Sequence, residues 1–326
     1  MMDSVQRLLA GDQRTLSRAI TSLERGGVEA TQLMQAVDPH TGGGYTIGIT
    51  GPPGVGKSTI VDQLTGLLRK QGLTVGIIAV DPTSPFTGGA LLGDRIRMQH
   101  HYLDPDVFIR SLATRGHSGG LARTVKSIVR LLDAAGKDII LVETVGVGQT
   151  ELGIMGVADT VLVAVMPESG DAVQTLKAGV MEIADIYLVN KSDREGANQM
   201  ATAIISMLHL APANSNWSPP VVLTRADAGE GIDLLWEKIQ EHQRYLTDTS
   251  QLEIKRQARR KQEFLETVEE ELSRRLKVLF ESNSQLVSLL DEIARKESEP
   301  YSAARMFLQS SDLQRAWLNP LLAKPD

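Results

Sequence analysis

The sequence predicts an α/β fold with a doubly wound, mostly parallel sheet and helical extensions at both ends. From Tyr45 onward, short β-rich runs alternate with amphipathic stretches, which is typical of repeated strand–helix units. Several of these runs are apolar throughout, as expected of strands buried on both faces of a parallel sheet. The two ends of the chain carry only helical patterns. We therefore expect the sheet to lie in the middle of the chain.

Seven runs are expected to be strands: YTIGIT (45–50), TVGIIAV (74–80), VFIRSL (107–112), DIILVET (138–144), TVLVAVM (160–166), IYLVN (186–190) and VVLT (221–224). Amphipathic stretches at 60–72 and 121–136 are expected to be helices between them. Each of these two stretches closes on a glycine, which suits the C-terminal cap of a helix.

Three segments are expected along the chain: an N-terminal helical extension over 1–43, a central domain over 44–247 and a C-terminal helical arm over 248–326. The extension reads as short helices that end in the breaker-rich run DPHTGGG. Its expected packing positions are Leu8, Leu9, Leu16, Ile20 and Leu23.

The arm begins with one long, highly charged helix, expected over 248–281. A narrow apolar stripe follows it, with steps of three or four residues: Leu265, Val268, Leu272, Leu276 and Leu279. Such a stripe favours helix–helix packing. Two interpretations stay open: the helix lies on its own domain, or it contacts a second subunit. The run SNS at 282–284 is expected to end this helix and cap the next, with a final short helix over 299–309.

Composition excludes several classes of protein. The chain has 326 residues, 42% of them hydrophobic, with a formal charge of −6, which disfavours a general nucleic-acid binder. It has no cysteine, so disulfides and thiolate metal sites are excluded. The N-terminus lacks the apolar core of a secretion signal, and no run is long enough to span a bilayer. We expect a cytoplasmic protein that binds neither nucleic acid nor membrane.

The run GPPGVGKST, which starts at Gly51, follows an expected strand and precedes an expected helix. It fits G-x-x-x-x-G-K-[ST], the P-loop pattern, in the context that pattern requires. Glycines let the backbone N–H groups point at phosphate oxygens, and the helix that follows adds its positive dipole end. Lys57 is expected at the β- and γ-phosphates, and Ser58 at Mg²⁺. The predicted nucleotide-binding residues here are Gly51, Gly54, Val55, Gly56, Lys57, Ser58 and Thr59. The fold is thus predicted to be that of a P-loop NTPase.

The run LVNKSD indicates guanine as the base. Asn190, Lys191 and Asp193 end an apolar strand as N-K-x-D does in GTPases. A carboxylate at Asp193 can accept from guanine N1–H and the 2-amino group, whereas adenine would leave it unpaired. Lys191 is expected along the base plane, and Ala226 is expected to offer its backbone N–H to guanine O6.

At the end of the run DIILVET, Glu143 takes the place of the aspartate usual in GTPases and is expected to act on Mg²⁺, directly or through water. Gly146 is expected to give its N–H to the γ-phosphate. Gln149 is a candidate for positioning the attacking water, with a polar surface residue as the alternative.

The segment AVDPTSPFTGGALLGDRIRM carries two further carboxylates. Asp81 ends an expected strand, and Asp94 follows thirteen residues later, after a glycine-rich stretch. Two carboxylates on one loop suit a Mg²⁺-sensing switch. The alternative is that Asp94 only caps a helix over 95–101.

Taken together, these motifs resemble those of the MeaB/ArgK GTPases, within a class of dimeric P-loop proteins. The resemblance rests on GPPGVGKST, AVDPTSPFTGGALLGDRIRM, SGGLARTV, VETVGVGQTE, ESGDAVQTLKAGVMEIADIYLVNKSD and PYSAAR, and spans nearly the whole chain. It implies a GTPase that gates cobalamin loading and protects an adenosylcobalamin-dependent acyl-CoA mutase, chiefly methylmalonyl-CoA mutase. It also implies a homodimer formed through the C-terminal helices.

The resemblance further implies Mg²⁺ contacts, some through water, at Ser58, Asp81, Asp94 and Glu143, and a third switch segment at Asp171, Gln174 and Lys177. The residues expected to carry catalysis are Lys57, Asp94, Glu143 and Gln149. GTP or GDP is the expected ligand, and cobalamin is expected on the partner and not on this chain. The sequence departs from the family at Arg225, where serine is common, and within DAVQTLKAG, where relatives commonly carry another acidic residue.

Two alternative functions stay open. A small-molecule kinase linked to amino-acid transport could use the same P-loop, although no residue here supports a kinase role. A nickel-enzyme maturation GTPase is disfavoured because the chain has no cysteine and no histidine-rich tail, and His40, His117, His209 and His242 are scattered. His100 and His101 are adjacent and are expected to point in different directions on a helix.

Overall fold

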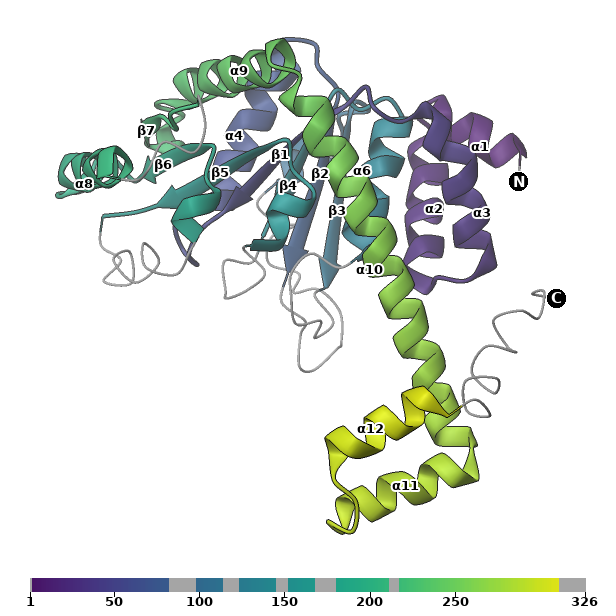
Figure 1. The fold of residues 1–326 in the computed structure, drawn as a ribbon. Helices are drawn as coiled ribbons and strands as arrows, with labels where there is room; N and C mark the ends of the chain where they lie inside the picture. Colours follow the sequence, from purple (N-terminus) through teal and green to yellow (C-terminus); the bar gives the residue numbers. More distant parts are fainter. Residues whose placement is uncertain are drawn as a thin grey trace. The chain divides into compact units, whose positions relative to one another are not determined.

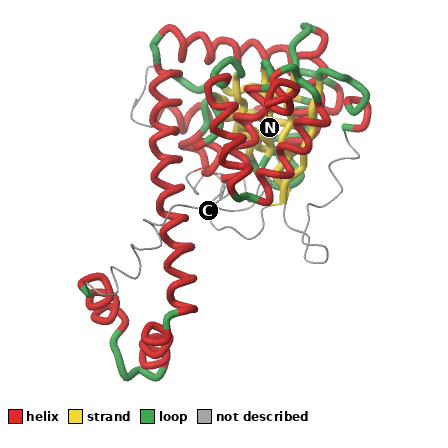
Figure 2. The backbone as a smooth tube through the Cα atoms, turned by 90° about the vertical axis from the view of Figure 1, so that its right-hand side faces the viewer, coloured by secondary structure: helices red, strands yellow, loops and turns green. Residues whose placement is uncertain are grey.

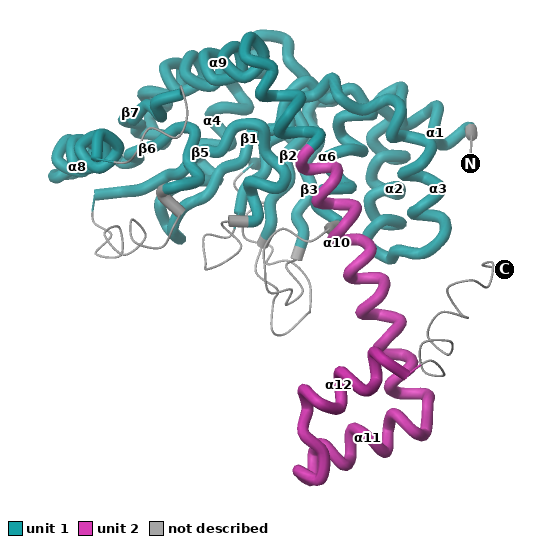
Figure 3. Tube along the Cα trace, in the orientation of Figure 1, with its two compact units in different colours: residues 1–257 teal, residues 258–326 magenta. Residues whose placement is uncertain are grey.

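The structure is a computed structural model that describes residues 2–81, 98–113, 123–144, 152–167, 180–210 and 217–310. The chain divides into two compact units, residues 1–257 and residues 258–326 (Figure 3). Each unit is described by itself below. Helix α10, Gln251–Ser282, begins in the first unit and ends in the second.

A seven-stranded sheet with the order β3-β2-β4-β1-β5-β6-β7 forms the centre of the first unit (Figure 1). Every neighbouring pair in this sheet is parallel. The strands are β1 Tyr45–Thr50, β2 Val75–Asp81, β3 Val107–Ala113, β4 Ile139–Glu143, β5 Thr160–Val165, β6 Ile186–Asn190 and β7 Val221–Thr224. All seven predicted strands are present, within one residue at each end.

The inner strands are buried on both faces, which explains their continuous apolar sequences. Strands β1, β4, β5 and β6 are buried along their whole length. One face packs against α4 (Lys57–Lys70) and α9 (Ile232–Asp248), where Leu64, Leu68 and Ile239 are buried. The other face packs against α2 (Gln13–Arg25), α6 (Arg123–Ala134) and α8 (Ala197–Leu210). Figure 2 shows the strands enclosed between helices. The predicted doubly wound α/β class is confirmed.

The N-terminal extension packs on one of these faces. It consists of α1 (Met2–Leu9), α2 and α3 (Val28–Val37), followed by the short 3-10 helix η1 (Asp38–His40). The Asp12 carboxylate caps α2 by accepting from the Thr15 backbone N–H, 2.7 Å away. Leu8, Leu16 and Ile20 are buried in the core, and Leu9 and Leu23 pack against it as predicted.

The start of α10 packs on the first unit, and Arg256 makes several of its contacts there. The Arg256 guanidinium forms a forked pair with the Asp159 carboxylate, at 3.2 and 2.7 Å. It also donates to the carbonyls of Gly42 and Gly44, at 3.0 and 2.7 Å. Since Gly42 and Gly44 lead into β1 and Asp159 leads into β5, this contact lies at the amino-terminal edge of the sheet.

The second unit consists of the rest of α10 with α11 (Ser284–Ala294) and α12 (Pro300–Gln309). Asn283 caps α11 by accepting from two backbone N–H groups, as the run SNS predicts. The Phe280 and Phe307 rings pack with centroids 5.2 Å apart. No residue of α10 is buried, and within its stripe Leu265 and Val268 are exposed.

Candidate functional site

The predicted nucleotide motifs meet at one edge of the sheet. The P-loop follows β1, Asp81 ends β2, Glu143 ends β4 and Asn190 ends β6. Because all strands are parallel, these carboxyl ends lie along the same edge. Such an edge is where open α/β sheets bind their ligands.

Two glycines of the P-loop allow contacts that a side chain would prevent. Gly51 has φ 138°, and a Cβ there would lie 2.1 Å from the Ala164 carbonyl oxygen. Gly56 has left-handed geometry, caps the start of α4, and would place a Cβ 2.5 Å from Asn190 Nδ2. The loop can therefore press against β5 and β6 only with glycine at these positions.

The functional side chains of the P-loop are buried. Lys57 Nζ donates to the carbonyls of Gly51 and Pro52, at 2.8 and 3.1 Å, so the ammonium group lies over the loop. Ser58 Oγ donates to Glu143 Oε1 at 2.7 Å. A hydroxyl and a carboxylate joined at this distance provide hard oxygen donors of the kind that Mg²⁺ prefers.

Asn190 connects the phosphate side of the site to the base side. Its Nδ2 donates to the Val55 carbonyl at 2.7 Å. Its Oδ1 accepts from Thr224 Oγ1 and from the Ala226 backbone N–H, both at 3.1 Å. The Ala226 N–H predicted to bind guanine O6 is thus donated to Asn190 in this structure, and its role toward the base stays a prediction. The bridging role of Asn190 is not deducible from sequence spacing.

Lys191 and Asp193 follow on a loop with unusual backbone geometry. Lys191 has φ 58°, rare for a non-glycine residue, and such strain gathers at functional sites. Its Nζ contacts Met166 Sδ at 3.5 Å. The Asp193 side chain is about half exposed, 4.0 Å from Arg225 Nε.

Arg225, the departure from the family pattern, stands among three carboxylates. Its guanidinium lies 3.5 Å from Asp227, 3.9 Å from Glu230 and 4.0 Å from Asp193. These groups are substantially exposed, so each pair contributes little stability. The main effect of Arg225 is to place a positive charge beside Asp193, the carboxylate predicted to select the base.

Six predicted site residues lie outside the described residues: Asp94, Gly146, Gln149, Asp171, Gln174 and Lys177. Their roles stay predictions. Residues 95–97 of the helix expected over 95–101 also lie outside, and Gln99–His101 form the short 3-10 helix η2.

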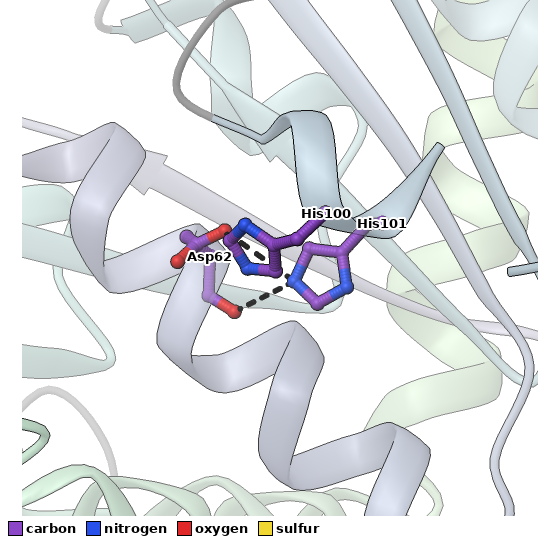
Figure 4. A group of neighbouring side chains, drawn as sticks. All are labelled: Asp62, His100 and His101. Carbon is purple, nitrogen blue, oxygen red and sulfur yellow. Dashed lines mark hydrogen bonds and ion pairs between the residues drawn. The ribbon is translucent and has the colours of Figure 1, made fainter. Parts of the chain in front are cut away.

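The expectation that His100 and His101 point in different directions is wrong. Both rings turn toward Asp62 on α4 (Figure 4). Their Nε2 atoms lie 3.0 and 3.3 Å from Asp62 Oδ1, and the ring centroids are 4.2 Å apart. The Asp62 carboxylate, opposed by burial, raises the pKa of His101. The tight turn of η2 allows the convergence, and nothing in the sequence links residue 62 to residues 100 and 101.

Comparisons with known proteins agree with this arrangement. The family described as "Methylmalonyl Co-A mutase-associated GTPase MeaB" matches residues 16–280. A Pyrococcus abyssi protein provisionally named a GTPase is 46% identical over 308 residues, covering 94% of this chain and 95% of that protein. A Mus musculus protein named "Methylmalonic aciduria type A homolog, mitochondrial" is 31% identical over 324 residues, covering 93% of this chain and 77% of that protein.

A solved structure described as "Crystal structure of LAO/AO transport system kinase" has the same fold. It superposes with a TM-score of 0.72 at 28% identity and covers 95% of this chain and 97% of that one. Within the part of the chain that the structure describes, no helix has the length and apolar character to cross a membrane.

Proposed function

This chain belongs to the MeaB family of methylmalonyl Co-A mutase-associated GTPases, and from that membership we propose that it is a GTP-hydrolysing chaperone of an adenosylcobalamin-dependent acyl-CoA mutase. It gates cobalamin loading and protects the mutase from inactivation. Methylmalonyl-CoA mutase is the partner proposed. The observation that carries this proposal is the family match over 16–280, which includes the P-loop, Glu143 and the NKSD run in one chain.

The geometry of the site supports GTP as the ligand. The Lys57 ammonium group lies over the P-loop carbonyls and can turn to the β- and γ-phosphates, and the amino terminus of α4 faces the same place. Asn190 hydrogen-bonds to the P-loop and to the end of β7. The segments proposed to bind the phosphates and those proposed to bind the base are therefore joined by one side chain. Asp193 accepts from guanine N1–H and the 2-amino group.

In the proposed reaction, water attacks the γ-phosphorus and the bond from that atom to the β–γ bridging oxygen breaks. GDP leaves, and the proton of the attacking water passes to solvent or phosphate. Ser58 and Glu143, together with Asp81 and Asp94, would hold Mg²⁺, and the ion would neutralise charge on the phosphates. Lys57 stabilises the charge that develops on the transferred group. Gln149 orients the water.

Phosphate release tests this function directly. The full chain is incubated with GTP, with and without an acyl-CoA mutase carrying adenosylcobalamin. We expect free phosphate, released faster when the mutase is present. Lys57→Ala is expected to abolish release, whereas Lys70→Ala, an exposed lysine at the end of the same helix, should leave it unchanged.

The predicted third switch segment, which contains Lys177, provides a second test of the chaperone function. Lys177→Ala should weaken the stimulation by the mutase far more than it weakens GTP binding, because Lys177 lies outside the nucleotide motifs. A chain that hydrolyses GTP but responds to no cobalamin-dependent mutase would contradict the chaperone function alone.

A small-molecule kinase is the second candidate. Its support is the solved structure of the same fold, whose name is that of a transport system kinase. A kinase would transfer the γ-phosphoryl group to an acceptor and release little free phosphate. Mass spectrometry of reactions containing basic amino acids distinguishes the two: a phosphorylated amino acid would favour the kinase, and inorganic phosphate alone would exclude it.

A further inference from the structure

Outside the nucleotide site, we propose that Asp62, His100 and His101 form a binding site for a divalent transition-metal ion such as Zn²⁺. The three side chains each offer one ligand atom, and these atoms all lie within 4.8 Å of one another. They come from two elements, α4 and η2, which are far apart in sequence (Figure 4). No motif of the nucleotide site includes them.

The distances fit a metal polyhedron. Asp62 Oδ1 lies 3.0 Å from His100 Nε2 and 3.3 Å from His101 Nε2. Zinc bonds of about 2.0–2.1 Å in a tetrahedral site place neighbouring ligand atoms about 3.3 Å apart. Both oxygen–nitrogen separations are thus already close to those of a zinc site.

A hydrogen-bonded cluster explains part of the arrangement, because His101 Nε2 lies 3.3 Å from the Asp62 backbone carbonyl oxygen, but it leaves the Asp62 carboxylate unexplained. Asp62 Oδ1 is buried and accepts no hydrogen bond from the residues that the structure describes, although two ring nitrogens stand close to it. A buried carboxylate oxygen normally accepts a well-directed hydrogen bond. Asp62 Oδ1 lies beside the ring nitrogens of His100 and His101. A metal ion bound between them would give this oxygen a partner.

The site is open on one side. The His100 side chain is 62% exposed, whereas those of His101 and Asp62 are 9% and 14% exposed. A hydrated ion can therefore approach past His100, and water can complete its coordination. His101 and Asp62, held by packing, give the site a fixed base.

The donor set selects the class of metal. Two imidazole nitrogens and one carboxylate oxygen suit Zn²⁺, Co²⁺, Ni²⁺ or Cu²⁺, whereas Mg²⁺ and Ca²⁺ prefer oxygen ligands alone. The site is thereby chemically different from the Mg²⁺ site proposed at Ser58 and Glu143. An ion bound by all three residues would cross-link α4 to η2, so it should raise the melting temperature of the chain.

The test is metal binding by the full chain without nucleotide and with excess Mg²⁺. Zn²⁺ is titrated against a chromophoric chelator, and Co²⁺ is followed by its visible absorption. We expect one ion per chain, a Co²⁺ spectrum of a site with nitrogen ligands, and a higher melting temperature with Zn²⁺. His100→Ala, at an exposed position that should not disturb folding, should weaken Zn²⁺ binding roughly tenfold or more. Asp62→Asn should do the same.

His209→Ala is the matched control, because His209 is also an exposed histidine at a helix end. It should bind Zn²⁺ as the parent does. Equal Zn²⁺ affinity of the parent and His100→Ala would overturn the proposal, as would a parent chain that binds no Zn²⁺ at micromolar concentration. GTP hydrolysis does not enter the test, so failure of this proposal and failure of the GTPase function are distinguishable.

Discussion

Gly56 connects the shape of the P-loop to the position of Asn190, which follows on the base side of the site. Its left-handed backbone and the 2.5 Å approach of Asn190 Nδ2 both require the absence of a Cβ. Gly56→Ala should therefore lower GTP affinity tenfold or more, because the strained backbone alone costs about 1–2 kcal/mol. Equilibrium binding of a fluorescent GTP analogue measures this loss.

Gly66 on the same helix serves as the control. A Cβ there meets nothing within 4 Å, and its backbone is helical. Gly66→Ala should keep GTP affinity and raise the free energy of unfolding by up to about 1 kcal/mol, as alanine does inside helices. An unaltered GTP affinity in Gly56→Ala would contradict the role given to that glycine.

Asp193 carries the prediction for base specificity. Asp193→Asn should exchange guanine preference for xanthine preference, because an amide can donate where the carboxylate only accepts. The Arg225 guanidinium 4.0 Å away loses a charged neighbour in this variant but keeps Asp227 and Glu230. Competition between GTP and xanthosine triphosphate gives the answer, and undiminished GTP preference would refute the assignment.

The positions of the short motifs in the fold were predictable from the sequence, whereas the nucleotide-binding roles of their residues stay predictions. The P-loop residues and Asn190 lie where their motifs place them, because each follows directly on a strand end. The contacts that need two distant segments were not predictable. Asn190 bridging to Val55 and the convergence of His100 and His101 on Asp62 both depend on how loops from different strands meet.

At the scale of elements, a buried polar chain joins β1, β5 and α9. Tyr45 Oη and Thr160 Oγ1 lie 2.6 Å apart, and Thr160 Oγ1 lies 2.8 Å from His242 Nδ1. His242 Nε2 is 3.4 Å from Asp185, which also faces Lys255. Burial lowers the pKa of His242 to about 4, although Asp185 opposes this shift.

This pKa shift predicts a pH-dependent stability. The His242 side chain has a pKa near 6.5 in the unfolded chain and about 4 in the folded chain. Between these pH values it is protonated only in the unfolded chain. Stability is therefore complete above pH 6.5 and falls as pH decreases from 6.5 to 4, by on the order of 3 kcal/mol. Urea unfolding at several pH values should show a smaller fall for His242→Gln than for the parent. Parallel curves for the two proteins would exclude His242 as the cause.

The elements themselves were largely predictable. Short β-rich runs identified every strand, and most of these runs are apolar throughout because the inner strands are buried on both faces. The start of α4 was harder to predict. The apolar pattern begins at Ile60, whereas the helix begins at Lys57 because Gly56 turns the chain there.

At the scale of the whole molecule, we propose that α10 contacts a second copy of the chain in a homodimer. Phe264 and Leu265 are 67% and 53% exposed, whereas Leu272 and Leu276 are half-buried. We therefore expect Phe264→Glu combined with Leu265→Glu to convert the proposed homodimer to monomers without lowering the melting temperature. Light scattering reports the mass, with Lys261→Glu, exposed on the same helix, as the control. A monomeric parent at micromolar concentration would contradict the dimer.

The fork of Arg256 on Asp159 has a consequence for how the chain is synthesised and folds. The same guanidinium donates to the Gly42 carbonyl, 214 positions earlier, so a growing chain cannot complete the first unit until residue 256 has left the ribosome. A chain ending at residue 247 would remove the Arg256 cation from beside the buried Asp159 carboxylate, at a cost of roughly 3–5 kcal/mol. A chain ending at 257 would keep the pair. Proteolysis of the two shortened chains should degrade the first much faster, and equal resistance would mean that the sheet closes without this late contact.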